Sequence, residues 1–108
     1  MNFEVRTISS FEKEFKRLFK KYPSLKSDLF ILISQLELEP FQGIALGKDF
    51  YKIRLSISSK GKGKSGGARI ITCIKIARRV VYLASIYDKS EKSAITDTEL
   101  KFLASRIG

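Results

Sequence analysis

The chain has 108 residues, of which 44% are hydrophobic and 30% are charged. This length fits one domain spanning residues 1–108, and the composition is globular rather than disordered. No apolar run approaches the roughly 18 residues that a membrane-spanning helix needs, and the N-terminus has no export pattern. The single cysteine, Cys73, excludes an internal disulfide and suits a reducing compartment. We therefore expect a soluble, cytoplasmic protein without a membrane partner.

Positive charge is concentrated in one part of the chain. The net charge is +10, and residues 48–92 carry twelve Lys or Arg residues against three acidic residues, a net of +9. A localised positive field attracts a polyanion and releases its counterions. This part of the chain is expected to bind nucleic acid, although a solvated basic face without a partner would have the same composition.

The first third of the chain predicts a strand followed by two helices. Residues 2–8 alternate between apolar and polar side chains, as a half-buried strand does. A capping box at Ser9–Glu12 begins an amphipathic helix whose apolar residues recur every three or four positions. A second helix starts near Ser24 or Ser27 and runs to about Glu37, so the two helices form a hairpin.

The middle of the chain predicts a loop, a strand and a second connection. Glycines break any pattern in residues 41–49, which indicates a loop. Residues 50–57 alternate, so one face is apolar while Lys52 and Arg54 project together from the other. Residues 58–67 contain four glycines, three lysines and no apolar side chain, which predicts a mobile basic connection.

The last third predicts two central strands and a helix. Residues 68–76 and 80–87 are apolar and β-branched and are joined by a tight hairpin. A second capping box, Thr96–Glu99, begins a terminal helix that ends at Gly108. The expected fold is α+β: an N-terminal strand, a two-helix hairpin, a three-stranded antiparallel meander and a C-terminal helix, on a single twisted sheet.

Several kinds of chemistry are excluded by composition. The chain has no histidine, which removes a conventional nucleophilic triad and a histidine-based ribonuclease mechanism. Cys73 alone cannot hold zinc and reads as a small core residue, so we expect no metal and no cofactor. The glycine-rich segment lacks the spacing of a nucleotide-binding P-loop.

The remaining candidates are basic and hydroxyl side chains that could share one face of the sheet. Cleavage of RNA by its own 2′-hydroxyl requires a base, an acid for the leaving oxygen, and cations for the developing charge. Lysine, arginine and tyrosine can supply all three. Alternating lysine and arginine on a strand would equally suit a solvated polar face. The candidates are Lys52, Arg54, Arg69, Tyr87 and Lys89.

Three segments carry a resemblance to a known family. They are Tyr51–Leu55, Lys60–Ile71 and Ile86–Lys92, and the glycine-lysine loop followed by an arginine-led strand is the most specific of them. In order and spacing they resemble the HigB-like branch of the RelE/HigB-type toxins of bacterial type II toxin-antitoxin systems, which belong to the RelE/ParE superfamily. Those toxins cleave messenger RNA on the translating ribosome.

The resemblance implies a fold, an activity and partners. The fold would be a microbial-ribonuclease-type sheet packed by helices, and the activity that of a metal-independent mRNA endonuclease which stops translation. Lys52 would act as base or charge clamp, and Arg54 and Arg69 would stabilise the transition state. Tyr87 or Lys89 would assist the leaving group, and this choice stays open because Ser90 follows Lys89 where RelE itself has an arginine.

The resemblance also implies how the toxin meets its partners. The partners would be messenger RNA, the ribosome and a cognate antitoxin with an acidic segment that folds on binding, while the toxin alone would be monomeric. Two alternatives remain: a ParE-type toxin that poisons gyrase on the same fold, and a nucleic-acid-binding module without activity. Further contacts to RNA or the ribosome are expected from Lys60, Lys62, Lys64, Arg78, Arg79 and Lys92.

Overall fold

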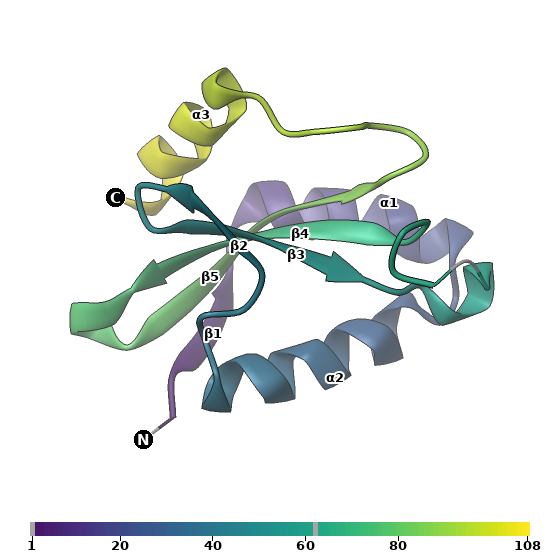
Figure 1. The fold of residues 1–108 in the computed structure, drawn as a ribbon, viewed down its shortest axis with the longest axis horizontal. Helices are drawn as coiled ribbons and strands as arrows, with labels where there is room; N and C mark the ends of the chain where they lie inside the picture. The colour runs from purple at the N-terminus through teal and green to yellow at the C-terminus, as the bar shows by residue number, and fades with distance from the viewer. Residues whose placement is uncertain (1, 62) are drawn as a thin grey trace.

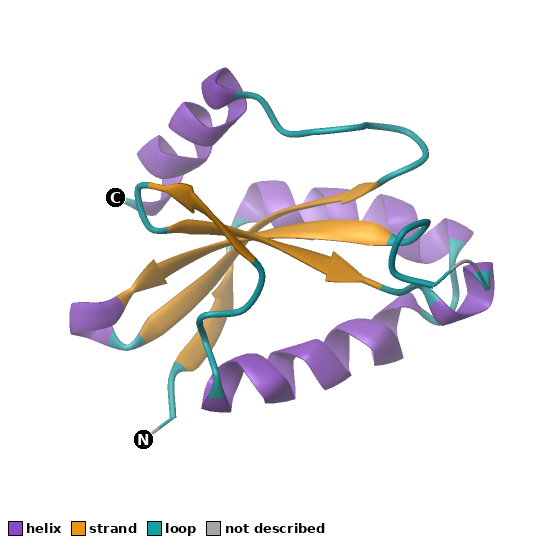
Figure 2. Cartoon of the chain, viewed as in Figure 1, coloured by secondary structure: helices purple, strands orange, loops and turns teal. Residues whose placement is uncertain are grey.

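The computed structural model describes residues 2–61 and 63–108, and these form one sheet with helices on both faces (Figures 1 and 2). Within them the sheet has five strands in the order β1-β5-β4-β3-β2. Strand β1 is parallel to β5, and all other neighbours are antiparallel. This arrangement confirms the expected α+β class. The bounds are β1 Glu4–Thr7, α1 Ser9–Lys21, α2 Leu25–Leu38, β2 Ile44–Gly47, β3 Phe50–Leu55, β4 Ala68–Lys75, β5 Val80–Asp88 and α3 Asp97–Ile107.

The loop expected over residues 41–49 contains a strand, so that prediction was wrong there. Strand β2 pairs with the start of β3, with Ile44 opposite Lys52. Only four residues long and mostly exposed, it lacks the alternation that would mark a strand. Gly43 has φ 87°, and a Cβ there would lie 2.1 Å from the Lys52 carbonyl oxygen. Glycine is therefore required where β2 approaches β3.

One of the two expected capping boxes forms and the other does not. At Thr96–Glu99 both reciprocal bonds between side chain and backbone are present, at 3.1 and 2.9 Å, which confirms the start of α3. The box expected at Ser9–Glu12 is absent, because α1 already begins at Ser9, with Ile8 as its N-cap residue and no side-chain cap. The Glu12 carboxylate instead accepts a hydrogen bond from the Thr7 hydroxyl.

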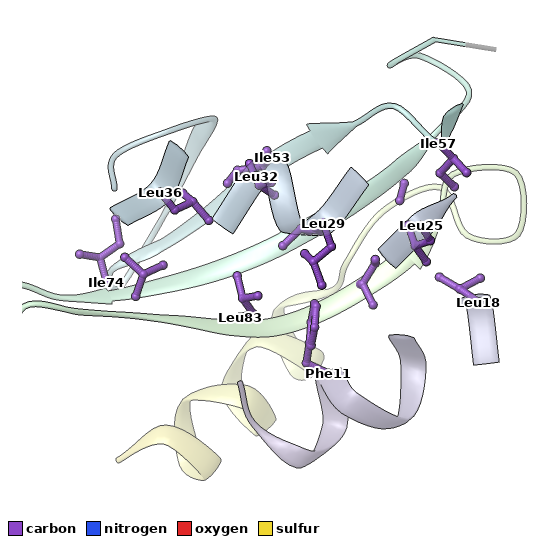
Figure 3. Close-up of a cluster of buried hydrophobic side chains, with 14 residues drawn as sticks. Phe11, Leu18, Leu25, Leu29, Leu32, Leu36, Ile53, Ile57, Ile74 and Leu83 are labelled. Carbon is purple, nitrogen blue, oxygen red and sulfur yellow. The ribbon is translucent and has the colours of Figure 1, made fainter. Parts of the chain in front are cut away.

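The main hydrophobic core lies between the sheet and the helices α1 and α2 (Figure 3). Helix α2 contributes four buried leucines with the three- and four-residue spacing of one helix face: Leu25, Leu29, Leu32 and Leu36. Full burial of each such side chain stabilises the fold by roughly 1.5–3 kcal/mol. In residues 2–61 and 63–108, no helix is long and apolar enough to cross a bilayer.

The opposite face of the sheet carries α3 at one end (Figure 1). Leu103 of α3 packs in a second cluster with Phe50 and Cys73. Cys73 is 2% exposed, which confirms its assignment to the core, and burial raises the pKa of its thiol. The start of β4, where Arg69 lies, is at the other end of the same sheet and is not under α3 (Figure 1).

The two expected central strands are confirmed as β4 and β5. Strand β5 lies between β4 and β1, but β1 covers only the first part of its length. Strand β1 pairs with β5 only as far as Leu83. Beyond that point α1 lies alongside β5, and the Glu14 carboxylate accepts hydrogen bonds from the Ser85 hydroxyl (3.0 Å) and the Ile86 amide (3.3 Å). Helix α1 thus satisfies the Ile86 amide at what would otherwise be an open sheet edge. This fixes the part of β5 that leads to Tyr87.

Candidate active site

Three of the candidate side chains form a row across the central strands. Arg54 on β3 pairs with Arg69 on β4, and Arg69 pairs with Tyr87 on β5. Directly paired residues project from the same face of a sheet. Lys52 lies two residues before Arg54 on β3, so strand alternation places it on that face as well. Lys89 lies in the turn that follows β5, two residues after Tyr87. The register therefore brings Lys52, Arg54, Arg69 and Tyr87 to one face of the sheet, and Lys89 follows directly after the last strand.

Arg69 is the most buried cation of this row, with 5% of its surface exposed. Its guanidinium donates hydrogen bonds to the carbonyl oxygens of Lys64 (2.9 Å), Ala68 (3.1 Å) and Ser65 (3.4 Å). Among the described residues no carboxylate forms an ion pair with it. A buried charge normally requires a partner of opposite charge. Arg69 is therefore held in place by the loop before β4, and no carboxylate of the described residues neutralises its charge.

Tyr87 stands next to Arg69 and has an unsatisfied hydroxyl. The oxygen is buried and has no hydrogen-bond partner within the described part of the chain. Burial raises the pKa of this phenol, and the nearby Arg69 charge offsets only part of the rise. The Lys92 ammonium lies 5.2 Å from the centre of the ring and also pairs with Glu99. Tyr87 is thus a neutral donor at neutral pH, and Lys92 lies against its ring.

Lys52, Arg54 and Lys89 are the accessible members of the site. Lys52 and Lys89 are half-buried and Arg54 is exposed. In residues 2–61 and 63–108, neither Lys52 nor Arg54 forms an ion pair, and the Lys89 ammonium donates to the Ser93 carbonyl at 3.1 Å. Lys52, Arg54 and Lys64 also line a pocket of about 540 Å³ beside α2. These cations can reach a bound polyanion.

The lysines of the glycine-rich connection have different surroundings. Lys60 lies at the end of a 3-10 turn, Ser58–Lys60, and its ammonium forms a buried ion pair with Asp88 at 2.6 Å. Lys64 is exposed at its side chain, while its carbonyl oxygen binds Arg69. Lys62 lies outside the described residues. The connection was expected to be mobile, but at Lys60 and at Lys64 it is attached to the sheet.

Arg78 and Arg79 are not part of the row. They lie in the turn between β4 and β5, at the end of β4 opposite to Arg69. Arg78 donates to the Gly108 carbonyl at 2.9 Å, which ties this turn to the end of α3. Arg79 is exposed and has φ 54°. Any contact of these two arginines with RNA would be separate from the candidate site.

Asp88 is the residue near the site that sequence reasoning missed. It is fully buried, and its carboxylate binds Lys60, Tyr22 and Ser90. Burial alone would raise the pKa of Asp88, but these three partners together hold it well below its usual range. The available signal was its position between Tyr87 and Lys89, in a segment with few acidic residues. Within the described residues, no group of three or more His, Cys, Asp or Glu side chains could hold a metal ion.

Comparison with known proteins identifies the family. The family model described as the RelE toxin of the RelE/RelB toxin-antitoxin system matches residues 10–106. The fold is similar to a double arginine-to-alanine mutant of the Escherichia coli toxin RelE in the free state, with a TM-score of 0.66, 16% identity and 100% of each chain covered. The isolated E. coli RelE toxin matches with a TM-score of 0.60 and 17% identity over 98% of this chain and 99% of that one.

A third match comes from another organism. A metal-bound toxin from Helicobacter pylori has a TM-score of 0.53 and 20% identity, over 82% of this chain and 97% of that one. At these identities the solved structures show a common fold, whereas the family model spans nearly the whole chain. The predicted resemblance is confirmed at the level of the family, which implies an antitoxin partner. The chain belongs to the RelE toxin family and is a toxin of a toxin-antitoxin system.

Proposed function

We propose that the chain is an endoribonuclease that cleaves messenger RNA on the ribosome. The observation that carries this proposal is the pair formed by Arg69 and Tyr87 on neighbouring strands. The arginine is buried without a carboxylate, and the hydroxyl is buried without a partner, among the described residues. Such unmatched polar groups are costly in a folded protein and are typical of functional sites. A phosphodiester supplies what both of them lack.

The proposed reaction is attack of the RNA 2′-hydroxyl on the adjacent phosphorus atom. The bond from phosphorus to the 5′ oxygen breaks, which leaves a 2′,3′-cyclic phosphate and a 5′-hydroxyl. Arg54 and Arg69 hold the phosphate oxygens on which negative charge develops. Lys52, beside Arg54 on the same face, accepts the 2′-hydroxyl proton or holds the phosphate as a fixed charge. This assignment uses two cations that alternate along β3, Lys52 and Arg54, and a third, Arg69, that pairs with Arg54 from β4.

The proton for the leaving 5′ oxygen comes from Tyr87 or Lys89. The raised pKa of Tyr87 keeps its phenol protonated at neutral pH, which an acid requires. Lys89 is more accessible and lies two residues after Tyr87, in the turn that follows β5. The variants Tyr87→Phe and Lys89→Met distinguish them. Loss of the acid slows cleavage of normal RNA by about 10²–10⁴-fold but has little effect on a substrate whose leaving oxygen is replaced by sulfur.

Several exposed cations support contact with the ribosome and the RNA chain. Lys64 lines the pocket beside the site, and Arg78 and Arg79 extend the positive charge along the molecule. Each phosphate contact makes binding more sensitive to salt. Lys92 can contact RNA only when its ion pair with Glu99 breaks.

The test is induction of the toxin in cells, followed by mapping of new 5′ ends in messenger RNA. Cuts in phase with codons, bearing 5′-hydroxyls, support the proposal. Intact transcripts with broken DNA would indicate a gyrase toxin instead, and intact transcripts with intact DNA would indicate a binding module. Arg69→Ala should lower cleavage by about 10²–10³-fold, the range for loss of one donor to a developing oxyanion. If that variant stays as toxic as the parent, the catalytic assignment is wrong.

The antitoxin is proposed to cover the basic row with acidic side chains. A partner segment that carries Asp or Glu can pair with Lys52 and Arg54, which have no ion pair among the described residues. Such a complex forms faster at low salt than at high salt. Lys52→Gln should therefore weaken neutralisation as well as cleavage.

A further inference from the structure

The carboxylate of Asp88 joins three segments that are far apart in the sequence. It is 0% exposed. One oxygen accepts hydrogen bonds from the Lys60 ammonium (2.6 Å), the Ser90 hydroxyl (2.8 Å) and the Ser90 amide (3.0 Å). The other accepts from the Tyr22 hydroxyl (2.7 Å) at the end of α1. Four charge-assisted or short hydrogen bonds fix one side chain at the last residue of β5.

Because of its position in β5, the hydrogen-bonded Asp88 carboxylate has a second effect. Asp88 lies between Tyr87 and Lys89, and its side chain reaches the helix side of the sheet, where Tyr22 lies. In a strand the residues on either side project from the opposite face. The Lys89 amide also donates to the Gly67 carbonyl at 3.1 Å, which continues the ladder with β4. Fixing Asp88 therefore fixes the backbone that carries both candidate acids.

Lys60 links the Asp88 carboxylate to the connection that holds Arg69. Its side chain is only 10% exposed, and its ammonium also lies 5.4 Å from the centre of the Tyr22 ring. The connection that begins at Lys60 ends where the carbonyl oxygens of Lys64 and Ser65 accept from Arg69. The ion pair thus attaches the start of this connection to the end of β5. Arg69 depends on the other end of the connection for its orientation.

We propose that Lys60 and Asp88 are positioning residues of the active site, which hold Arg69, Tyr87 and Lys89 in place relative to one another. The proposal rests on the proposed ribonuclease function. It replaces the contact between Lys60 and RNA that the sequence predicts. A lysine that is nine-tenths buried in an ion pair cannot neutralise a phosphate unless that pair breaks.

The matched variants Lys60→Met and Lys64→Met separate positioning from RNA binding. Lys60→Met should lower kcat by about 10- to 100-fold, because misplacement of reacting groups by about 1 Å costs that much. Its affinity for an uncleavable RNA with a 2′-deoxy scissile nucleotide, and the salt dependence of that affinity, should not change. Lys64→Met should instead weaken RNA binding: the slope of log affinity against log salt falls by about 0.7, a change that Lys60→Met should not show.

A second measurement, amide hydrogen exchange, tests the positioning of the backbone without any RNA. Hydrogen exchange should quicken at the amides of Lys89 and Ser90 in Lys60→Met, by about tenfold or more, while Ile70 and Leu83 in the core keep their protection. If the parent does not cut RNA, the proposed function fails, and this exchange pattern still decides whether Lys60 positions the row. If Lys60→Met keeps kcat and exchange while losing RNA affinity, the positioning role is overturned.

Three further variants keep the test decisive if Lys60→Met unfolds, since loss of Lys60 leaves a buried carboxylate unpaired. Lys60→Met combined with Asp88→Asn removes both charges, and Tyr22→Phe removes only the bond of 2.7 Å to Asp88. Both should lower kcat without changing RNA affinity, Tyr22→Phe less than the double variant. Lys60→Arg, which keeps a cation, should recover part of the kcat lost in Lys60→Met. A folded double variant with parental kcat and parental exchange would also overturn the proposal.

Discussion

Arg54 and Arg69 lie directly opposite each other on β3 and β4, on the same face of the sheet. Favourable pairs in this position contribute roughly 0.2–1 kcal/mol, and like charges oppose folding. The arrangement therefore lowers the stability of the free protein. A bound phosphate would reverse the sign of this interaction, because both cations would then face an anion. The pair indicates a site where activity and stability conflict.

Arg54→Gln should separate the two effects. Removal of one cation relieves the repulsion, so the free energy of unfolding should rise by a few tenths of a kcal/mol at low salt, as expected for an exposed charge. The gain should shrink at high salt because ions screen the repulsion. Cleavage should fall by about 10²–10³-fold. Urea unfolding at two salt concentrations and a cleavage assay measure both.

Lys26→Gln is the matched control for that variant. It removes one exposed positive charge from α2, away from the row. It should leave cleavage unchanged and should not reproduce the salt-dependent gain in stability. An equal gain in both variants would mean that Arg54 acts only through the net charge of the protein.

Tyr87→Phe should make the protein more stable and less active. The Tyr87 hydroxyl is buried without a partner in the described part of the chain. An unsatisfied buried group costs about 1–3 kcal/mol, so its removal should raise the free energy of unfolding by about 1 kcal/mol. Loss of the hydroxyl should slow cleavage if Tyr87 is the acid. Thermal unfolding and single-turnover cleavage test the two halves.

Variants at Thr72 and Tyr22 provide two controls for Tyr87→Phe, and their expected effects on stability are opposite to each other. The Thr72 hydroxyl is also buried without a partner among the described residues, so Thr72→Val should stabilise without loss of cleavage. The Tyr22 hydroxyl donates to Asp88, so Tyr22→Phe should destabilise by about 1.5–3 kcal/mol, the range for a bond to a charged group. A destabilising Tyr87→Phe would show that its hydroxyl has a partner in solution.

The fold was predictable where local pattern and burial agree. Alternation found β1 and β3, runs of apolar β-branched residues found β4 and β5, and the Thr96–Glu99 box found the start of α3. Strand β2 was missed because an exposed four-residue edge strand needs no hydrophobic alternation. The parallel pairing of β1 with β5 is a long-range contact that no local pattern encodes. Such pairings depend on the core formed by α1 and α2.

That candidate side chains share one face of the sheet was predictable, whereas their contacts were not. Strand alternation put Lys52 and Arg54 on one face, and the register then placed Arg69 and Tyr87 beside them. Sequence cannot distinguish a lysine that faces solvent from one that pairs with a distant acid. For that reason the partnership of Lys60 with Asp88 appeared only in three dimensions.

Glu14 should give the protein a measurable pH dependence. Burial raises the pKa of its carboxyl above its ordinary value near 4.5, and the hydrogen bonds from Ser85 and Ile86 offset only part of the rise. Between the two values the folded state binds more protons than the unfolded state. The contribution of Glu14 to stability is therefore full below about pH 4.5 and is lost as pH rises through the folded pKa.

Glu14→Gln should remove this dependence. Glutamine can still accept from Ser85 and Ile86 through its amide oxygen but carries no charge to desolvate. The variant and the parent should have similar free energies of unfolding near pH 4.5, and the variant should gain over the parent as pH rises toward 7. Ser85→Ala removes a hydrogen bond that lowers the pKa of Glu14. In this variant the loss of stability with rising pH should therefore continue to a higher pH than in the parent. Urea unfolding at several pH values measures all three proteins. If the stability of the parent instead rises relative to that of Glu14→Gln as pH increases, the Glu14 carboxylate is better solvated beside β5 than its burial indicates.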